Sequence, residues 1–176
     1  MPSVFTHPAV PLVLSLGLGR EVVSSRLLIC GIIASALPDL DVLAFPLGIS
    51  YSSQFGHRGF SHSLLFAVVA GLAGGCFFRW LRSTFSRCFL FLSVSIASHG
   101  LLDAFTNGGL GVALLWPWSD HRYFAPFRVI EVSPIGVATF FSERGLLVLK
   151  SEFLWIWLPA IVAGVVMLLI RRALSR

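Results

Sequence analysis

The stretch CFLFLSVSIASHGLLDAFT, residues 88–106, decides the fold because it combines a membrane-spanning helix with two ionisable side chains. It is long and apolar enough to cross a hydrocarbon core of about 30 Å as an α-helix. His99 and Asp103 stand four positions apart near its end, so one helix face presents both. Ionisable groups inside a span cost free energy unless they are paired, hydrated or metal-bound, so the pair indicates a functional site. The alternative is that Asp103 only orients His99 or caps a neighbouring helix.

The composition places the rest of the chain in a membrane as well. Of its 176 residues, 56% are hydrophobic and 12% are charged, and the mean hydropathy is +0.88, so a soluble fold would lack polar surface. Residues 61–81 and 152–170 are also long enough to span, while 27–49 is interrupted by LPDLDVLAFP and 8–19 is shorter. Pro38 is expected to end or kink the helix that begins at Leu27. We therefore expect one all-α domain over residues 1–176, a polytopic helical bundle of about four to five transmembrane helices.

The segment 107–151 has a different composition. Its central part, WPWSDHRYFAPFRVIEVSPIGV, is rich in aromatic residues and proline and carries both charge signs, which predicts a loop or small cap at the membrane surface. His121, Arg122 and Arg128 are candidates for holding a substrate headgroup. The alternative for these residues is interfacial anchoring.

The basic residues predict the orientation. The formal net charge is +5, but the arginines sit singly or beside apolar segments, which favours a topological signal over nucleic-acid binding. Three groups of arginines can share the cytoplasmic side, which also places the C-terminus there and the 107–151 segment outside. These groups are Arg20 and Arg26; Arg79, Arg82 and Arg87; and Arg171, Arg172 and Arg176.

The motif ALPDLD places two carboxylates just after a proline. Asp39 and Asp41 can both reach one cation, or one can bind the metal while the other orients a histidine. Apolar residues on both sides favour this interpretation. The alternative is a helix-ending turn with two solvated acids.

The motif GHRGFSHS adds two histidines and an arginine. His57 is expected to point from a loop and His62 from the first turn of the following helix, with Ser61 as the N-cap. Arg58 stays charged beside them, which suits an anionic substrate better than a metal cation. The alternative is a surface loop whose arginine contacts lipid phosphates.

In the predicted topology the histidines, aspartates and Arg58 of these motifs converge at the outer face of the membrane that the helices span. His7 joins them only if residues 8–19 rise most of the way across. Nitrogen and carboxylate ligands in this number exceed one tetrahedral zinc, so one or two divalent ions are expected, with zinc, manganese or iron compatible. The ionisable residues that are expected to converge are His7, Asp39, Asp41, His57, Arg58, His62, His99 and Asp103.

The succession of an early histidine, LPDLD, HRGFSHS, HGLLDAFTNGG and LLWPWSDHRY resembles the YdjM-like family over roughly residues 7–123. That family comprises bacterial inner-membrane proteins described as metal-dependent hydrolases, and it is similar to zinc-dependent phospholipase C. The resemblance implies a bacterial inner-membrane location. It also implies metal ligands at His99 and Asp103, with further candidates at His7, Asp39, His57 and His62.

The sequence thus predicts an integral membrane hydrolase that cleaves a phosphoester of a lipid or lipid-linked substrate, with no nucleic-acid partner. Asp41 or Asp39, whichever does not bind the metal, is the candidate general base, and Arg58 would stabilise charge developing on the phosphate. A metal-ion transporter and a metal-stabilised membrane scaffold without catalysis are the alternatives.

Overall fold

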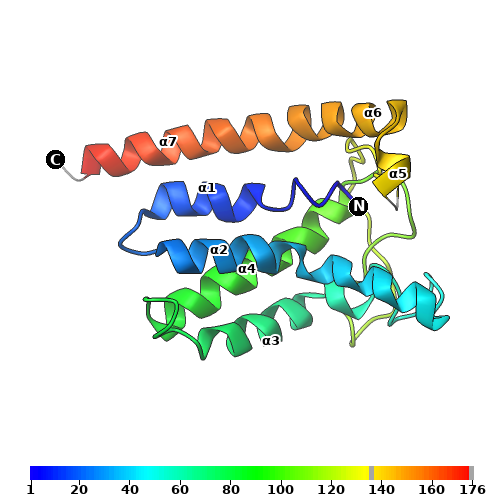
Figure 1. Cartoon of the computed structure of the whole chain (residues 1–176), viewed down its shortest axis with the longest axis horizontal. Helices are drawn as coiled ribbons and strands as arrows, with labels where there is room; N and C mark the ends of the chain where they lie inside the picture. Colours follow the sequence, from blue (N-terminus) through cyan, green and yellow to red (C-terminus); the bar gives the residue numbers. More distant parts are fainter. Residues whose placement is uncertain (135–136, 175–176) are drawn as a thin grey trace.

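The computed structural model describes residues 1–134 and 137–174, and within these residues it is helical with isolated β-bridges only. Figure 1 shows the helices as a bundle. The elements are α1 (Ala9–Leu18), α2 (Ser25–Ala36), η1 (Leu37–Leu47), η2 (Phe60–His62), α3 (Leu64–Gly75), α4 (Phe85–Ala104), α5 (Val137–Phe140), α6 (Glu143–Glu152), η3 (Phe153–Trp157) and α7 (Leu158–Leu174).

Three helical stretches are long and apolar enough to cross a membrane: Ser25–Leu47, Phe85–Ala104 and Glu143–Leu174. The apolar helices α1 and α3 are shorter, with 10 and 12 residues. The expected span 61–81 is therefore a shorter helix than predicted, because it ends at Gly75 and because Ser63, and not Ser61, is its N-cap and accepts a hydrogen bond from Phe66 N. The last helical stretch begins at Glu143, earlier than the predicted residue 152.

The α-helix ends at Ala36, before Pro38, as predicted, and the stretch around Pro38 continues as a 3₁₀-helix, η1. Proline is tolerated in a first helical turn because the amide hydrogen it lacks would have no partner there. The chain therefore changes from α2 to η1 at Leu37 without leaving the helical path. Asp39 and Asp41 both lie in η1, which ends at Gly48 with a positive φ of 78°.

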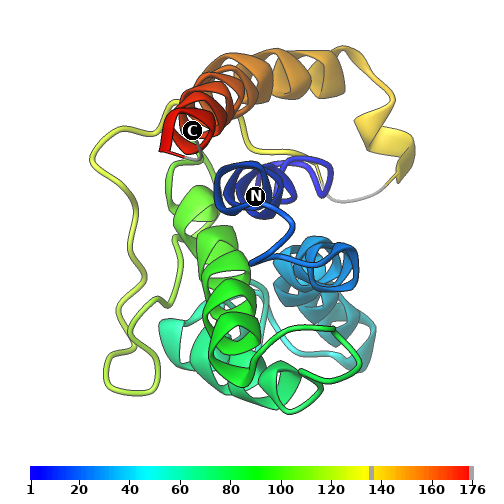
Figure 2. The same ribbon diagram turned by 90° about the vertical axis from the view of Figure 1, so that its left-hand side faces the viewer.

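The helices α2 and α3 both pack against α4, and α7 packs against α1 (Figures 1 and 2). Glycine permits the closest approaches. A Cβ at Gly71 of α3 would lie 2.0 Å from Ser93 Oγ of α4, and one at Gly17 of α1 would lie 2.2 Å from the side chain of Met167. One hydrophobic core joins Val23 and Leu27 to Cys88, Phe91 and Leu92 of α4.

The bundle has two different ends. Figure 1 shows the α1–α2 turn, the α3–α4 link and the C-terminus at one end, which we name the basic end, and the N-terminus and η1 at the other. Hydrogen bonds hold the basic end together: Arg26 donates to Trp80 O, Arg87 to Glu21 O and Arg171 to Leu16 O. The three arginine groups thus lie at the same end of the bundle, except for Arg176, which lies outside the described residues, and the cytoplasmic location of this end stays a prediction.

Candidate metal centre

His99 and Asp103 lie on one face of α4 and are fully buried. The His99 ring is oriented by its Nδ1, which lies 2.7 Å from the carbonyl oxygen of Ser35 on α2. A carbonyl can only accept, so Nδ1 carries a proton and donates it, and Nε2 is the ring nitrogen available to a metal. That Nε2 faces the interior of the cluster, which is the orientation that metal-binding histidines show.

His7 comes from the segment before α1 and stacks on the His99 ring, with ring centroids 3.6 Å apart. Its Nε2 lies 3.9 Å from a carboxylate oxygen of Asp39 and 3.9 Å from one of Asp103. Burial, together with the neighbouring His99, lowers the pKa of His7 to about 3. His7 is therefore neutral at physiological pH, as a metal ligand must be. The short helix α1 does bring this residue to the same end as the others.

His62 and Asp39 complete the group. His62 Nε2 lies 3.1 Å from His99 Nε2 and 3.5 Å from Asp103 Oδ2, and Asp39 Oδ1 lies 3.2 Å from His99 Nε2. Burial lowers the pKa of His62, but Asp103 and Asp41 outweigh it and raise the value to about 9. In the metal-free protein a proton on His62 therefore balances the surrounding carboxylates.

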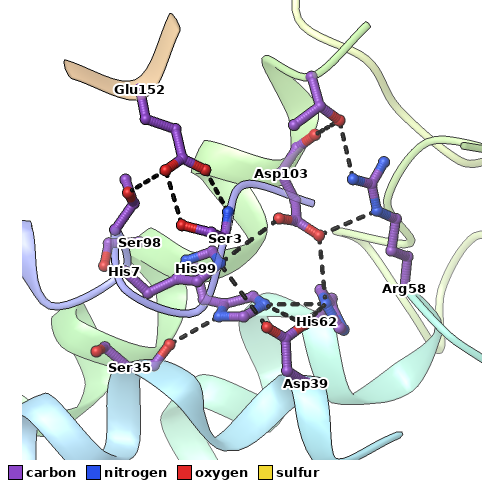
Figure 3. Close-up of polar contacts among 12 residues, drawn as sticks. Ser3, His7, Ser35, Asp39, Arg58, His62, Ser98, His99, Asp103 and Glu152 are labelled. Carbon is purple, nitrogen blue, oxygen red and sulfur yellow. Dashed lines mark hydrogen bonds and ion pairs between the residues drawn. The ribbon is translucent and has the colours of Figure 1, made fainter. Parts of the chain in front are cut away.

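The donor atoms fit a divalent cation. Tetrahedral nitrogen or oxygen ligands at about 2.0–2.1 Å from zinc lie roughly 3.3 Å from one another. The separations described above run from 3.1 to 3.9 Å. Among the described residues, both carboxylate oxygens of Asp39 and both ring nitrogens of His7 are buried without a hydrogen-bond partner. Buried polar atoms are rarely left so, and a bound cation would satisfy them. Figure 3 shows the carboxylates of Asp39 and Asp103 with the three imidazole rings between them.

Asp41 and His57 lie beside this group. Asp41 Oδ1 is 2.6 Å from His57 Nδ1, and Asp41 Oδ2 is 3.2 Å from His62 Nδ1. Asp41 also accepts hydrogen bonds from Ser61 Oγ and from the backbone amide of Arg58. Such a carboxylate orients metal-binding histidines from behind. Asp39, His57 and His62 offer ligand atoms within 4.8 Å of one another, as do His7, His99 and Asp103, so the residues present fit one or two ions.

Arg58 is fully buried and has a left-handed backbone, with φ 63°. Its Nε lies 3.0 Å from Asp103 Oδ2, and its Nη atoms donate to Thr106 Oγ1 at 2.8 Å and to Gly108 O at 2.9 Å. The guanidinium thus ties the end of α4 to the following loop and fixes the Asp103 carboxylate. These are the contacts of a positioning residue, and contact of Arg58 with a substrate stays a prediction.

The three candidates in the surface segment lie outside the cluster. Arg122 donates to the carbonyl oxygens of His57, Tyr51 and Ser53, so it holds the loop that carries His57. Arg128 is exposed and lies over the Phe124 ring at 4.6 Å, and His121 is exposed beside Tyr123. Their binding of a headgroup stays a prediction.

The sequence did not predict the hydrogen-bond network that holds the segment carrying His7 in place. Glu152, at the end of α6, is only 1% exposed. Its carboxylate accepts hydrogen bonds from Ser3 N, from Ser3 Oγ at 2.7 Å and from Thr6 Oγ1 at 2.8 Å, while Trp157 Nε1 donates to Thr6. This network holds the segment that delivers His7 (Figure 3). An acidic residue next to the apolar run 153–170 was the available signal.

The comparisons with known proteins agree with this picture of a membrane protein. The family model described as YdjM inner membrane protein matches residues 1–174. The chain is 52% identical to the inner membrane protein YbcI of Escherichia coli (strain K12) over 165 residues, which cover 92% of this chain and 94% of that protein. No solved structure matches.

Proposed function

The chain belongs to the YdjM inner membrane protein family, and we propose that it is a metal-dependent hydrolase that cleaves a phosphoester of a lipid or lipid-linked substrate. The observation that supports this most is the convergence of buried nitrogen and carboxylate donors from four separate parts of the chain. A bound divalent metal, zinc in the first instance, would polarise a phosphoryl oxygen and acidify water there. The contributing parts are the N-terminal segment, η1, the residues around η2, and α4.

The surroundings of the cluster favour a lipid substrate. An apolar groove of about 490 Å³ runs between the N-terminal segment and the α2–η1 helix. Among its lining residues are Pro8, next to His7, and Leu40, which stands between Asp39 and Asp41. An acyl or isoprenoid chain in this groove would place its phosphate beside the carboxylates.

The remaining residues have distinct roles in this proposal. Asp39 is a ligand because its oxygens lack other partners, which leaves Asp41 for proton transfer. Asp41 shares a 2.6 Å contact with His57, and the pair could accept a proton from water and return it to the leaving group. Arg58 keeps Asp103 in place. Under the positive-inside rule the basic end faces the cytoplasm, so the reaction would occur at the outer side of the inner membrane.

The test combines metal analysis with turnover. Protein purified in detergent should hold stoichiometric metal, and it should release phosphate or headgroup from one of a panel of phosphoester lipids only in the metal-loaded form. His99→Ala should abolish both, while His121→Ala, an exposed histidine outside the cluster, should keep both. Metal at background level in the wild type, even after reloading with zinc or manganese, would refute the proposal.

Burial of the donors favours a second candidate, a metal-stabilised membrane scaffold without catalysis. Most of the donor side chains are no more than 3% exposed, which is typical of a structural site. In a scaffold, removal of the metal should lower the melting temperature and no lipid of the panel should be hydrolysed. A transporter is less well supported, because the hydrophobic core of Leu27, Phe91 and Leu92 fills the bundle between the cluster and the basic end.

A further inference from the structure

A second apolar groove begins at the basic end of the bundle and extends to Leu37, where η1 begins. It has a volume of about 570 Å³ and opens between α2 and α3, with α4 as its floor. It is hollow because Ala34 of α2 and Ala70 and Gly74 of α3 are small and both helices pack mainly against α4. The residues that form it include Cys30, Ala34, Ala70, Gly74, Leu92 and Ile96.

The mouth of this groove at the basic end is cationic. Trp80 and Leu81 line it there. The Arg26 guanidinium lies over the Trp80 ring at 5.6 Å and donates to Trp80 O at 2.9 Å, and its side chain is exposed. Arg79 and Arg82, which flank Trp80 and Leu81 in the sequence, are exposed as well. The Arg26 charge therefore stands at one end of a cavity whose walls are apolar, and Arg79 and Arg82 are next to its lining residues in the chain.

This combination selects an amphiphile with a negative headgroup. On a convex helix surface an acyl chain is held from one side only, whereas the groove surrounds it with α2, α3 and α4 and so gains dispersion contacts. The lining runs from Cys30 of α2 to Leu37 at the start of η1, roughly 10 Å at 1.5 Å per residue, which suits the part of a single acyl chain nearest its headgroup. The arginines at the mouth would then meet a phosphate, and Trp80 would lie at headgroup level.

We infer that this groove is a binding site for an anionic phospholipid of the cytoplasmic leaflet, with its phosphate among Arg26, Arg79 and Arg82 and one acyl chain between α2 and α3. The proposed phosphate site lies at the basic end, whereas the metal centre lies toward the opposite end of the bundle (Figure 1). The inner part of the groove reaches Ile33 and Leu37, which also line the groove beside the metal centre. Occupation of the lipid site does not depend on the proposed hydrolase activity.

The test measures lipid affinity by native mass spectrometry of the detergent-purified full chain. The probes are phosphatidylglycerol and phosphatidylcholine with identical palmitoyl and oleoyl chains. Each arginine near a lipid phosphate contributes about fivefold in affinity, so the wild type should bind phosphatidylglycerol at least about fivefold more tightly. The triple variant Arg26→Gln, Arg79→Gln, Arg82→Gln should bind the two lipids equally.

A substitution that fills the groove provides an independent test of the same proposal. Ala70→Leu should weaken phosphatidylglycerol binding at least about fivefold, because its added side chain occupies the space of the acyl chain. The matched controls are Ala163→Leu, on the exposed face of α7, and Arg144→Gln, outside the basic end; both should bind as the wild type does. Melting temperatures confirm that each variant is folded. Equal binding of the two lipids by the wild type, or wild-type binding by Ala70→Leu, would overturn the assignment.

Discussion

Arg26 at the basic end and Arg58 at the metal centre show how differently the two ends of this bundle hold charge. Arg26 is exposed, donates to one backbone carbonyl and lies over an aromatic ring. Arg58 is fully buried and contacts a carboxylate, a hydroxyl and a carbonyl. The first side chain can reach water or headgroups when a partner is lost, whereas the second cannot. Charges at the metal centre therefore depend on one another, while those at the basic end are largely independent.

The largest expected effect is that of Asp103→Ala, which removes a metal ligand and leaves Arg58 buried without its carboxylate. Loss of one partner from a buried ion pair costs about 3–5 kcal/mol, so the melting temperature of the detergent-purified protein should fall steeply and metal should be absent. The matched change at the basic end is Arg82→Ala, which should alter the melting temperature little. A similar decrease in melting temperature for both variants would show that the two ends do not differ in this respect.

Arg58→Lys sharpens the comparison without removing charge. Lysine lacks the planar fork that contacts Asp103, Thr106 and Gly108 together, so Asp103 should lose its fixed orientation. Zinc affinity should fall by about 10- to 100-fold, as when a group that supports a metal ligand is lost. Competition with a chelator measures this change. Arg26→Lys is the control, and a lysine at position 58 with wild-type zinc affinity would show that Asp103 is held by other contacts.

The third prediction concerns the proton that His62 releases when the metal centre binds zinc. The pKa of His62 is raised to about 9, so this histidine is protonated at neutral pH and must release its proton before it binds metal. Zinc affinity should therefore increase with pH below this value, by about tenfold per pH unit for one released proton. Calorimetry in buffers of different ionisation enthalpy counts the protons released at pH 7. The control His121→Ala should keep the same slope, and zinc binding that is independent of pH between 6 and 8 would contradict this assignment.

The smallest expected effect is that of Glu152→Gln, which acts on His7 through the N-terminal segment. Glutamine keeps one acceptor oxygen, so one of the hydrogen bonds from Ser3 and Thr6 should be lost, at a cost of about 1–2 kcal/mol. We expect a several-fold weaker zinc affinity together with a modest decrease in melting temperature. Glu143→Gln, on the first turn of the same helix α6, should change neither quantity.

The elements that the sequence predicted well are those with local signals. The apolar runs, the four-residue spacing of His99 and Asp103 and the arginine groups depend on neighbours along the chain, and the structure has the helices and the shared basic end that they predicted. The polar candidates of the cluster were found because ionisable groups are rare beside apolar runs. The sequence also predicted that residues 8–19 must rise for His7 to join the others, and α1 does so.

The features that the sequence missed depend on contacts between distant segments. No local rule distinguishes Asp39, which lacks hydrogen-bond partners, from Asp41, which has several, because the difference arises from where η2 packs against η1. Ser61 looked like a helix cap, but its hydroxyl donates to Asp41, and Ser63 two residues later caps α3. The sequence did not predict the buried contact of the Arg58 guanidinium with Asp103, because the two residues are 45 positions apart and meet only in the folded chain.

The bond between Glu152 and Ser3 also bears on how the protein is made. These residues are separated by 149 positions, so the N-terminal segment cannot reach its place until nearly the whole chain has left the ribosome. The donors of the histidine and aspartate cluster all lie at or before Asp103, so they can enter the bilayer before Glu152 is synthesised. The hydrogen bonds that fix the segment carrying His7 are consequently a late event of biogenesis, because they require the end of α6.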